Sequence, residues 1–277
     1  MSDFKTAIVI LNYKSWRDTL KEVENCVKLL KFDYSDIIVI DNDSPNDSSE
    51  KLKNASNVHN FVFIAAEKNL GYAAGNNIGL RYAYNKGYRY GWVLNNDIIV
   101  DDAQIITKMV GVFAKDKSIA VVNPDIYAPD GHMFNRDAKR PTFFDYTIGA
   151  LKYKKDGRKI QDLGGYAYIY RPQGCCMMVD LEKMDEVNYM DEHTFLYVEE
   201  PILAERLLKH NYHCACCLNA KIVHNHSTTV KSVLAKSKIR NINNDSFKYY
   251  LKEYRNFNII QIKLCCLFNQ IKWMLLG

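Results

Sequence analysis

A chain of 277 residues with 48% hydrophobic and 25% charged residues can bury the core of one large domain with a small appendage, which excludes a disordered chain. The net charge of +5 is modest but uneven, because residues 231–277 hold nine Lys or Arg against two acids. The first seven residues carry charges and lead into a short apolar run, unlike a signal peptide, so we expect a cytoplasmic protein.

Short apolar runs alternate with helical patterns through the first hundred residues. Strands are expected at 7–11, 37–40, 61–65 and 91–94, and helices at 16–30, 48–53 and 73–86. This alternation predicts an α/β fold with a mostly parallel sheet flanked by helices.

The second part of the chain is less regular. A helix is expected at 102–113 and a strand at 119–123, followed by a long excursion with short strands over 125–165. Order returns with a strand at 174–179, a helix at 199–209 and a strand at 213–218. From about residue 235 the pattern is helical, aromatic and basic. Lys263 and Lys272 interrupt its apolar run, which predicts a surface-lying amphipathic helix instead of a membrane span.

The eight cysteines include adjacent pairs, which cannot easily form a disulfide framework, so reduced thiols are expected. His213, Cys214, Cys216 and Cys217 suggest zinc, but two well-separated Cys-x-x-Cys pairs are missing. We interpret them as buried structural residues.

Polar residues follow two of the predicted strands. Asp41–Asp43 follows the second, and Asn95-Asn96-Asp97 follows the fourth, at the strand ends where open α/β sheets bind ligands. A hard divalent cation needs few protein carboxylates when a diphosphate supplies other ligands. Asp97 is therefore the predicted direct ligand, with Asn95 bonding a ribose or a ligated water. A simple turn is the alternative interpretation.

Gly71, Gly75 and Gly79 are spaced one turn apart at the start of a predicted helix. This spacing lets a backbone or a ligand approach closely. A dinucleotide-binding site is the rival interpretation. It fails because G-x-G-x-x-G is absent and the glycines follow the third strand, not the first.

Four blocks in order, Ile8–Tyr13, Val39–Ser44, Asn69–Gly79 and Leu94–Asp97, together resemble family 2 glycosyltransferases of the GT-A fold. The resemblance continues through 174–179, 190–200 and 223–226 and covers about residues 6–230. It implies a GT-A domain at 1–230. The basic charge and helical pattern of residues 231–277 predict a C-terminal extension that associates with a membrane. The glycine-asparagine block looks most like the bacterial rhamnosyltransferase branch.

The resemblance also implies roles for single residues. Asp97 and His224 would hold Mn²⁺ or Mg²⁺, although His224 could instead be a histidine hydrogen-bonded beside a strand end. The residues expected to bind the nucleotide part of the donor are Tyr13, Asp41, Asp43, Gly71, Asn76 and Asn95.

Glu199 and Glu200 correspond to the family's Glu-Asp pair at a helix start. An inverting transfer needs a carboxylate to take the proton of the acceptor hydroxyl. Glu200 is the first candidate for this base, one methylene longer than the usual Asp, and Asp191 is the second. Without the motif, paired acids at a helix start would be interpreted as favourable interactions with the helix dipole.

These features predict an inverting, metal-dependent hexosyltransferase that uses dTDP-rhamnose to build a cell-surface polysaccharide precursor. The expected acceptor is a polyprenyl-diphosphate-linked glycan at the anionic inner face of the cell membrane, with no nucleic-acid partner. A UDP-hexose transferase of the same fold, a nucleotidyltransferase and a non-catalytic sugar-nucleotide-binding module are the alternatives. The glycine-rich loop of nucleotidyltransferases is missing after the first strand.

Overall fold

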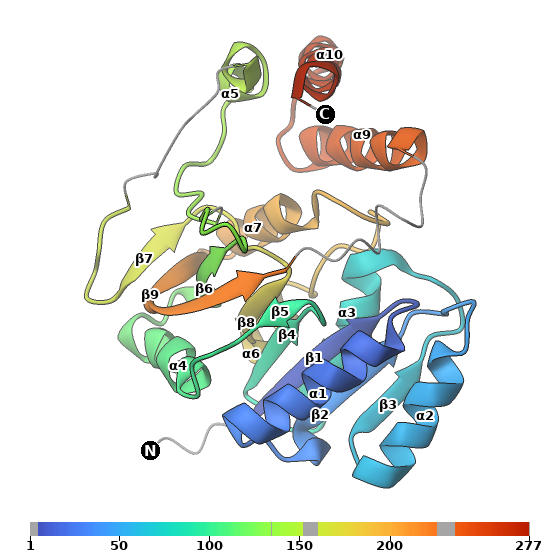
Figure 1. Cartoon of the computed structure of the whole chain (residues 1–277). Coiled ribbons are helices and arrows are strands. Elements are labelled where there is room, and N and C mark those ends of the chain that lie inside the picture. Colours follow the sequence, from blue (N-terminus) through green and yellow to red (C-terminus); the bar gives the residue numbers. More distant parts are fainter. Residues whose placement is uncertain (1–4, 134, 152–159, 226–235, 277) are drawn as a thin grey trace.

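The computed structural model of the chain describes residues 5–133, 135–151, 160–225 and 236–276. These residues form a nine-stranded sheet covered by helices (Figure 1). The strand order is β3-β2-β1-β4-β8-β6-β9-β5, and β7 pairs with β9 outside this path.

The first four strands form the parallel part of the sheet that the sequence predicts. They are β1 (Thr6–Asn12), β2 (Ile37–Asp41), β3 (Val62–Ala65) and β4 (Tyr90–Leu94). Apolar side chains of β1 and β2 alternate between two core clusters, because successive residues of a strand face opposite sides. Helices α1 (Trp16–Leu30) and α2 (Ser48–His59) cover one face, and α3 (Gly71–Asn85) covers the other.

Glycines let α3 lie close to the sheet. A Cβ atom at Gly75 would stand 2.7 Å from the side chain of Leu11, and one at Gly79 would stand 2.5 Å from the side chain of Val9. A larger residue at either position would push the helix away. The glycine spacing predicts a close approach of either a backbone or a ligand. At Gly75 and Gly79 the structure shows that α3 approaches the strand β1.

Antiparallel pairing enters beyond β4. The strand β8 (Cys176–Asp180) lies antiparallel between β4 and β6 (Ile119–Tyr127), and β9 (His213–His224) runs parallel to β6. Two short strands, β5 (Ile98–Ile99) and β7 (Tyr166–Ile169), pair antiparallel with β9. The helices here are α4 (Ile105–Lys115), α6 (Leu181–Glu186) and α7 (Glu199–Lys209).

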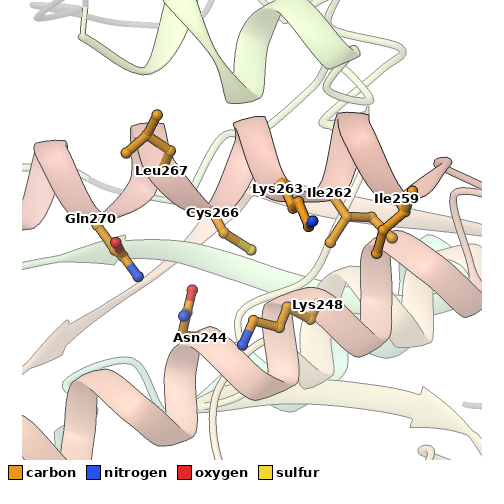
Figure 2. Close-up of a pocket in the computed structure, with 8 residues that line it drawn as sticks. All are labelled: Asn244, Lys248, Ile259, Ile262, Lys263, Cys266, Leu267 and Gln270. Carbon is orange, nitrogen blue, oxygen red and sulfur yellow. The ribbon is translucent and has the colours of Figure 1, made fainter.

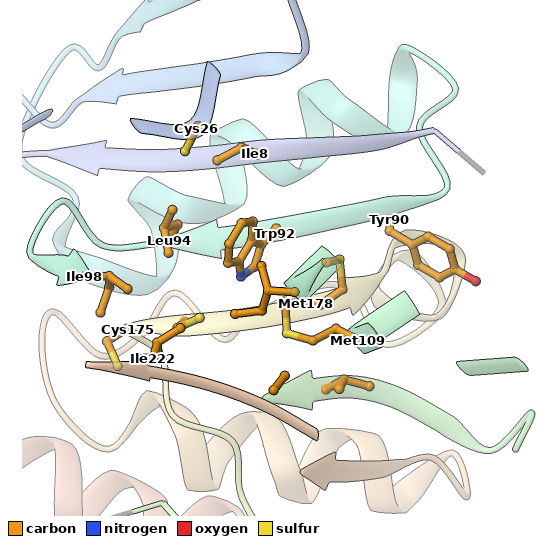
Figure 3. Close-up of a cluster of buried hydrophobic side chains, with 14 of the residues drawn as sticks. Ile8, Cys26, Tyr90, Trp92, Leu94, Ile98, Met109, Cys175, Met178 and Ile222 are labelled. Carbon is orange, nitrogen blue, oxygen red and sulfur yellow. The ribbon is translucent and has the colours of Figure 1, made fainter. Parts of the chain in front are cut away.

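The core on the α1 and α4 side is built around Trp92, which is fully buried (Figure 3). All eight cysteines are buried, and none forms a disulfide. Cys214, Cys216 and Cys217 pack in the two core clusters, as expected for structural thiols.

The excursion after β6 begins later than predicted, because β6 continues to Tyr127. It then holds α5 (Phe143–Tyr146) and the short 3-10 helix η2 (Ile148–Leu151). Both lie beside α10 (Ile259–Leu276), which packs on α9 (Lys236–Glu253), at one end of the molecule (Figure 1).

The C-terminal segment is helical, as predicted, and shares a third core cluster with α7. The buried members of that cluster are Ile202, Tyr250, Leu251, Ile262, Cys265 and Cys266. Within the described residues, no helix is both long and apolar enough to cross a bilayer. The predicted domain boundary at 230/231 and His226 fall outside the residues that the structure describes.

Candidate functional site

Two of the predicted metal ligands meet at the end of the sheet. The pairing of Ile98 with His224 across β5 and β9 brings Oδ1 of Asp97 within 3.2 Å of Nε2 of His224. The backbone N–H of Asn225 donates to the carbonyl of Asp97 at 3.0 Å, an ordinary hydrogen-bond distance. The side chains of Asp97 and His224 are 13% and 12% exposed, and Oδ1 of Asp97 is itself buried.

This pair alone would leave most of a metal ion's coordination sphere open. Among the described residues, no group of three or more His, Cys, Asp or Glu could hold a metal ion. A carboxylate and an imidazole suit Mn²⁺, whose remaining ligands can come from a substrate diphosphate and water. The donor set therefore fits an ion that binds together with a nucleoside diphosphate.

The two neighbours of Asp97 in the Asn-Asn-Asp motif make different contacts. The Nδ2 of Asn96 donates to the hydroxyls of Ser15 and Thr19 on the α1 side, both at 2.8 Å. The backbone N–H of Asn95 donates to the carbonyl of Cys175 at 2.9 Å. Asn96 is thus an anchor for the turn, a role that the sequence analysis missed.

Asp41 organises the turn after β2. It is buried, and its carboxylate accepts hydrogen bonds from Nδ2 of Asn12 at 2.6 Å and from the hydroxyl of Ser44 at 2.7 Å. Ser44 also accepts from the backbone N–H of Lys14 at 2.8 Å, which ties the turns after β1 and β2 together. The predicted nucleobase contact of Asp41 would have to come from a carboxylate already engaged in this turn.

Tyr13 and Asp43 lie on the same two turns. Asp43 is exposed and Tyr13 is half-buried, and the ammonium of Lys14 lies 5.2 Å from the centre of the Tyr13 ring. Both side chains are accessible to a ligand, and their contact with the nucleobase stays a prediction.

The loop before α3 is held by a residue that the sequence analysis did not select. Asn42 is buried; its Nδ2 donates to the carbonyl of Gly71 at 2.9 Å, and its Oδ1 accepts from the N–H of Leu70 at 3.0 Å. Gly71 has φ +81°, and a Cβ atom there would stand 1.9 Å from the carbonyl oxygen of Phe195. A glycine is therefore needed at position 71 so that the backbone can approach the loop before α7. This packing does not support the predicted role of Gly71 in donor binding.

Asn76 and Asn77 differ although they are adjacent. Asn76 is 1% exposed; its Nδ2 donates to the carbonyl of Tyr72 at 3.0 Å, while its Oδ1 has no partner among the described residues. Asn77 instead exchanges hydrogen bonds with the backbone of Met190. A buried acceptor without a partner suggests a missing ligand or water, and the contact of Asn76 with the donor stays a prediction.

Glu199 and Glu200 begin α7 in different environments. Burial, and then the charge of Glu200, raise the pKa of Glu199 to about 8, which favours its protonated form. Glu200 is partly exposed; its Oε1 accepts from the backbone N–H of Gly174 at 3.3 Å, and Arg171 lies 4.0 Å from its Oε2. Because a protonated carboxyl cannot accept a proton, Glu200 is the better placed of the two to act as a base.

Asp191, the second predicted base, is enclosed by donors. Its Oδ2 accepts from the hydroxyl of Tyr249 at 2.9 Å and from that of Tyr254, and its Oδ1 accepts from the N–H of His193 at 2.9 Å. Burial alone would raise its pKa, but hydrogen bonds from Tyr254, His193 and Tyr249 outweigh burial and lower the pKa to about 2. This environment disagrees with the prediction of a base, which needs a pKa nearer the working pH.

One segment connects the metal pair to Glu200. Gly174 donates to Glu200, and the next residue, Cys175, accepts from the backbone of Asn95. The hydroxyl of Tyr72 closes this segment against α3 by donating to the carbonyl of Gly174 at 2.6 Å. Glu200 and Asn95, which lies two residues before Asp97, therefore contact adjacent residues of one segment.

The model of glycosyl transferase family 2 matches residues 7–186. The chain belongs to this family. A similar protein, the low-salt glycan biosynthesis hexosyltransferase Agl10 of Haloferax volcanii, is 25% identical over 223 residues, which is 79% of this chain and 66% of that protein. The chain thus spans just under two thirds of the length of this relative.

Solved structures confirm the GT-A fold of this family 2 chain. GalNAc-T7, crystallised with UDP, GalNAc and Mn²⁺, has a TM-score of 0.65 at 14% identity over 97% of this chain and 55% of its own. The mannosyltransferase PcManGT of Pyrobaculum calidifontis, in complex with GDP-Man and Mn²⁺, has a TM-score of 0.61 at 10% identity over 97% and 69%. TarS 1–349 of S. aureus has a TM-score of 0.55 at 11% identity over 98% and 78%.

Proposed function

We propose that this family 2 chain is an inverting, metal-dependent glycosyltransferase that moves a hexose from a nucleoside diphosphate to a hydroxyl of a glycan. The observation that carries this proposal is that Asp97 pairs with His224, while the carboxylate of Glu200 contacts Gly174, whose neighbour Cys175 bonds the backbone of Asn95. A non-catalytic binding module would have no need for a carboxylate in that place.

The chemistry is a single displacement. The acceptor oxygen forms a bond to the anomeric carbon as the bond from that carbon to the diphosphate breaks, and the hydroxyl proton moves to Glu200. An ion held by Asp97 and His224 would offset the negative charge of the departing diphosphate. The raised pKa of Glu199 favours its neutral form, which would not repel the donor phosphates.

The donor we propose is dTDP-rhamnose, with a UDP-hexose as the alternative. The resemblance of Asn69–Gly79 to the rhamnosyltransferase branch supports the sugar. The relatives crystallised with UDP or with GDP-Man, each with Mn²⁺, support a nucleoside-diphosphate donor and a divalent ion. Three residues would distinguish nucleobases. The side chains of Tyr13 and Asp43 are accessible, and Oδ1 of Asn76 has no partner among the described residues.

The acceptor we propose is a polyprenyl-diphosphate-linked glycan at an anionic inner membrane face, where a cytoplasmic enzyme would bind peripherally. Of the twelve large apolar side chains that are exposed in the described part of the chain, seven lie on α5, η2 and α10. They are Phe144, Ile148, Ile259, Ile260, Leu264, Leu267 and Met274. Apolar residues gathered on one surface typically mark an interaction site.

A basic groove lies between α9 and α10, beside these residues. It has a volume of about 340 Å³, and Lys248 and Lys263 line it together with Ile259 and Leu267 (Figure 2). Lys248 also forms an exposed ion pair with Asp245 at 3.3 Å, a contact of little energetic weight at a solvated surface. Lysines beside exposed apolar side chains suit lipid phosphates above acyl chains.

Calorimetric titration of UDP and dTDP, with and without Mn²⁺, tests the enzymatic proposal. Wild type should bind one of them in a metal-dependent way, and Asp97→Ala should lose this dependence. Asp101→Ala, a change at a nearby exposed acid, should bind like wild type. Absence of nucleoside diphosphate binding under every condition would refute the proposal, and binding without transfer to any acceptor would favour the non-catalytic module.

Sedimentation with vesicles tests the membrane proposal separately. Wild type should pellet with vesicles of phosphatidylglycerol and phosphatidylcholine, but not with phosphatidylcholine alone. The double variant Lys248→Glu/Lys263→Glu should pellet less, whereas Lys51→Glu/Lys53→Glu, on the exposed side of α2, should match wild type. Equal pelleting of both double variants would remove the groove from the proposal.

A further inference from the structure

The segment that leads into the catalytic helix α7 is fastened to α9. Tyr249 and Tyr254, at the end of α9 and just beyond it, donate hydrogen bonds to Oδ2 of Asp191. The hydroxyl of Ser246 donates to the carbonyl of Leu196 at 2.9 Å. The rings of His193 and Tyr249 are stacked, with centroids 5.3 Å apart and planes inclined by 17°.

The same segment is held on its other side by α3. Nδ2 of Asn77 donates to Glu192 at 2.8 Å, and Arg81 forms an ion pair with Glu192 at 2.7 Å. The N–H of Tyr72 donates to the carbonyl of Phe195 at 2.9 Å. Residues 190–196 therefore lie between α3, on the predicted donor side, and α9.

The backbone immediately before the two glutamates is in an unfavourable conformation. Tyr197 has φ +70° and Val198 has φ +69°, in the left-handed region that a β-branched residue such as valine strongly disfavours. Such a conformation persists only where its surroundings determine it. The contacts from α3 and α9 supply these surroundings, because they fix the segment up to Leu196.

We infer that Asp191 is a positioning residue. Its hydrogen bonds from Tyr249 and Tyr254 hold this segment on α9 and thereby fix the position of the Glu200 carboxylate beside Gly174. This inference rests on the proposed role of Glu200 as the base. Asp191 is 5% exposed, and its low pKa keeps it ionised as a strong acceptor for both hydroxyls. The helix α9 then belongs to the catalytic unit and is more than a membrane-associating extension.

The inference predicts that removing the two hydroxyls disturbs catalysis without touching Asp191. Tyr249→Phe/Tyr254→Phe should lower kcat roughly 100-fold, the cost of a small misplacement of a catalytic group. The KM for the donor should stay within about twofold, since the donor-side residues are untouched. Tyr88→Phe, which removes a tyrosine–carboxylate hydrogen bond to Asp36 elsewhere, should keep the wild-type kcat.

Asp191→Asn completes a double-mutant cycle. Groups that act through one contact have non-additive effects, so the loss of kcat in the triple variant should be clearly smaller than the product of the two separate losses. A base would behave differently: Asp191→Asn would lower kcat by roughly 10²–10⁴, and Tyr249→Phe/Tyr254→Phe would leave it unchanged. That pattern would overturn the inference.

Hydrogen exchange gives a readout that does not require activity. Amides of residues 193–200 should exchange at least about tenfold faster in Tyr249→Phe/Tyr254→Phe than in wild type and in Tyr88→Phe, because local opening becomes easier. Unchanged exchange would refute the fastening even if the chain proved inactive. Faster exchange in a chain that binds no nucleotide would instead refute only the proposed function.

Discussion

Nε2 of His224 lies 3.2 Å from Oδ1 of Asp97 because the last residue of β9 pairs with the first residue of β5. If both side chains hold the ion, His224→Ala should weaken Mn²⁺-dependent binding of the preferred nucleoside diphosphate. The loss of affinity should be at least roughly 10–100-fold, which is the loss measured when a residue that only supports a metal ligand is removed. Calorimetry at fixed Mn²⁺ measures this, with the exposed His210→Ala as control. Equal affinities of the two variants would show that His224 is only a strand-end residue.

Gly71 and Gly87 form a matched pair for measuring the contact with Phe195. Their φ angles are +81° and +78°, but a Cβ atom at Gly71 meets the Phe195 carbonyl, whereas one at Gly87 meets nothing within 4 Å. Gly87→Ala should cost about 1–2 kcal/mol from backbone strain alone. Gly71→Ala should lower the free energy of unfolding by about 1–3 kcal/mol more. Urea unfolding measures both, and equal losses would contradict the contact.

The buried carboxyl of Glu199 should make stability depend on pH. Its pKa rises from 4.5 to about 8 on folding, so between these values the folded chain binds more protons than the unfolded chain. Its contribution is therefore complete below pH 4.5 and is lost as pH rises through 8.

Glu199→Gln, which cannot ionise, should remove this loss. Its Tm should exceed that of wild type by at least about 2–4 °C at pH 9, the shift expected from roughly 1 kcal/mol in a chain of this size. The difference should shrink at pH 5. Glu67→Gln, at an exposed position, should follow wild type at both values, and a constant difference for Glu199→Gln would contradict the titration.

The buried thiols should be slow to react. Burial raises the pKa of Cys176 to about 12 and that of Cys214 further, and the thiolate is the reactive form. A disulfide reagent at pH 8 should label fewer than about one thiol per native chain and all eight in guanidinium. Lys53→Cys, at an exposed position, should add one fast thiol. Rapid labelling of several native thiols would contradict this packing.

The local sequence pattern predicted the exact bounds of some helices but missed parts of some strands. The apolar spacing of α1 and α7 ends where those helices end, because both bury one face. The strand β9 was predicted to stop at residue 218 but continues to His224. Its second half alternates, with Lys221 exposed and Ile222 buried, so it lacks the continuous apolar run of its first half. The strand β5 has two residues, too few to show any period.

The candidate site required more than local patterns. Asp97 could be selected from its place after a strand, whereas His224 came from family resemblance, since no spacing links the two. The partners of Asp191 lie 58 and 63 residues away, and a tyrosine on an amphipathic helix gives no sign of what its hydroxyl meets. Asn42, Asn77 and Asn96 were likewise hidden, because anchoring asparagines and ligand-binding asparagines look alike in sequence.

The strand order also determines when the ion site can exist during synthesis. The strands β1 to β4 come from a continuous N-terminal stretch and can pair as they leave the ribosome, whereas the strand that pairs with β5 among the described residues is β9. Because contacts distant in sequence form late, a nascent chain would complete its donor-side turns before Asp97 meets His224. If Asp97 and His224 hold the proposed ion, a newly made chain could therefore bind it only after β9 has been translated.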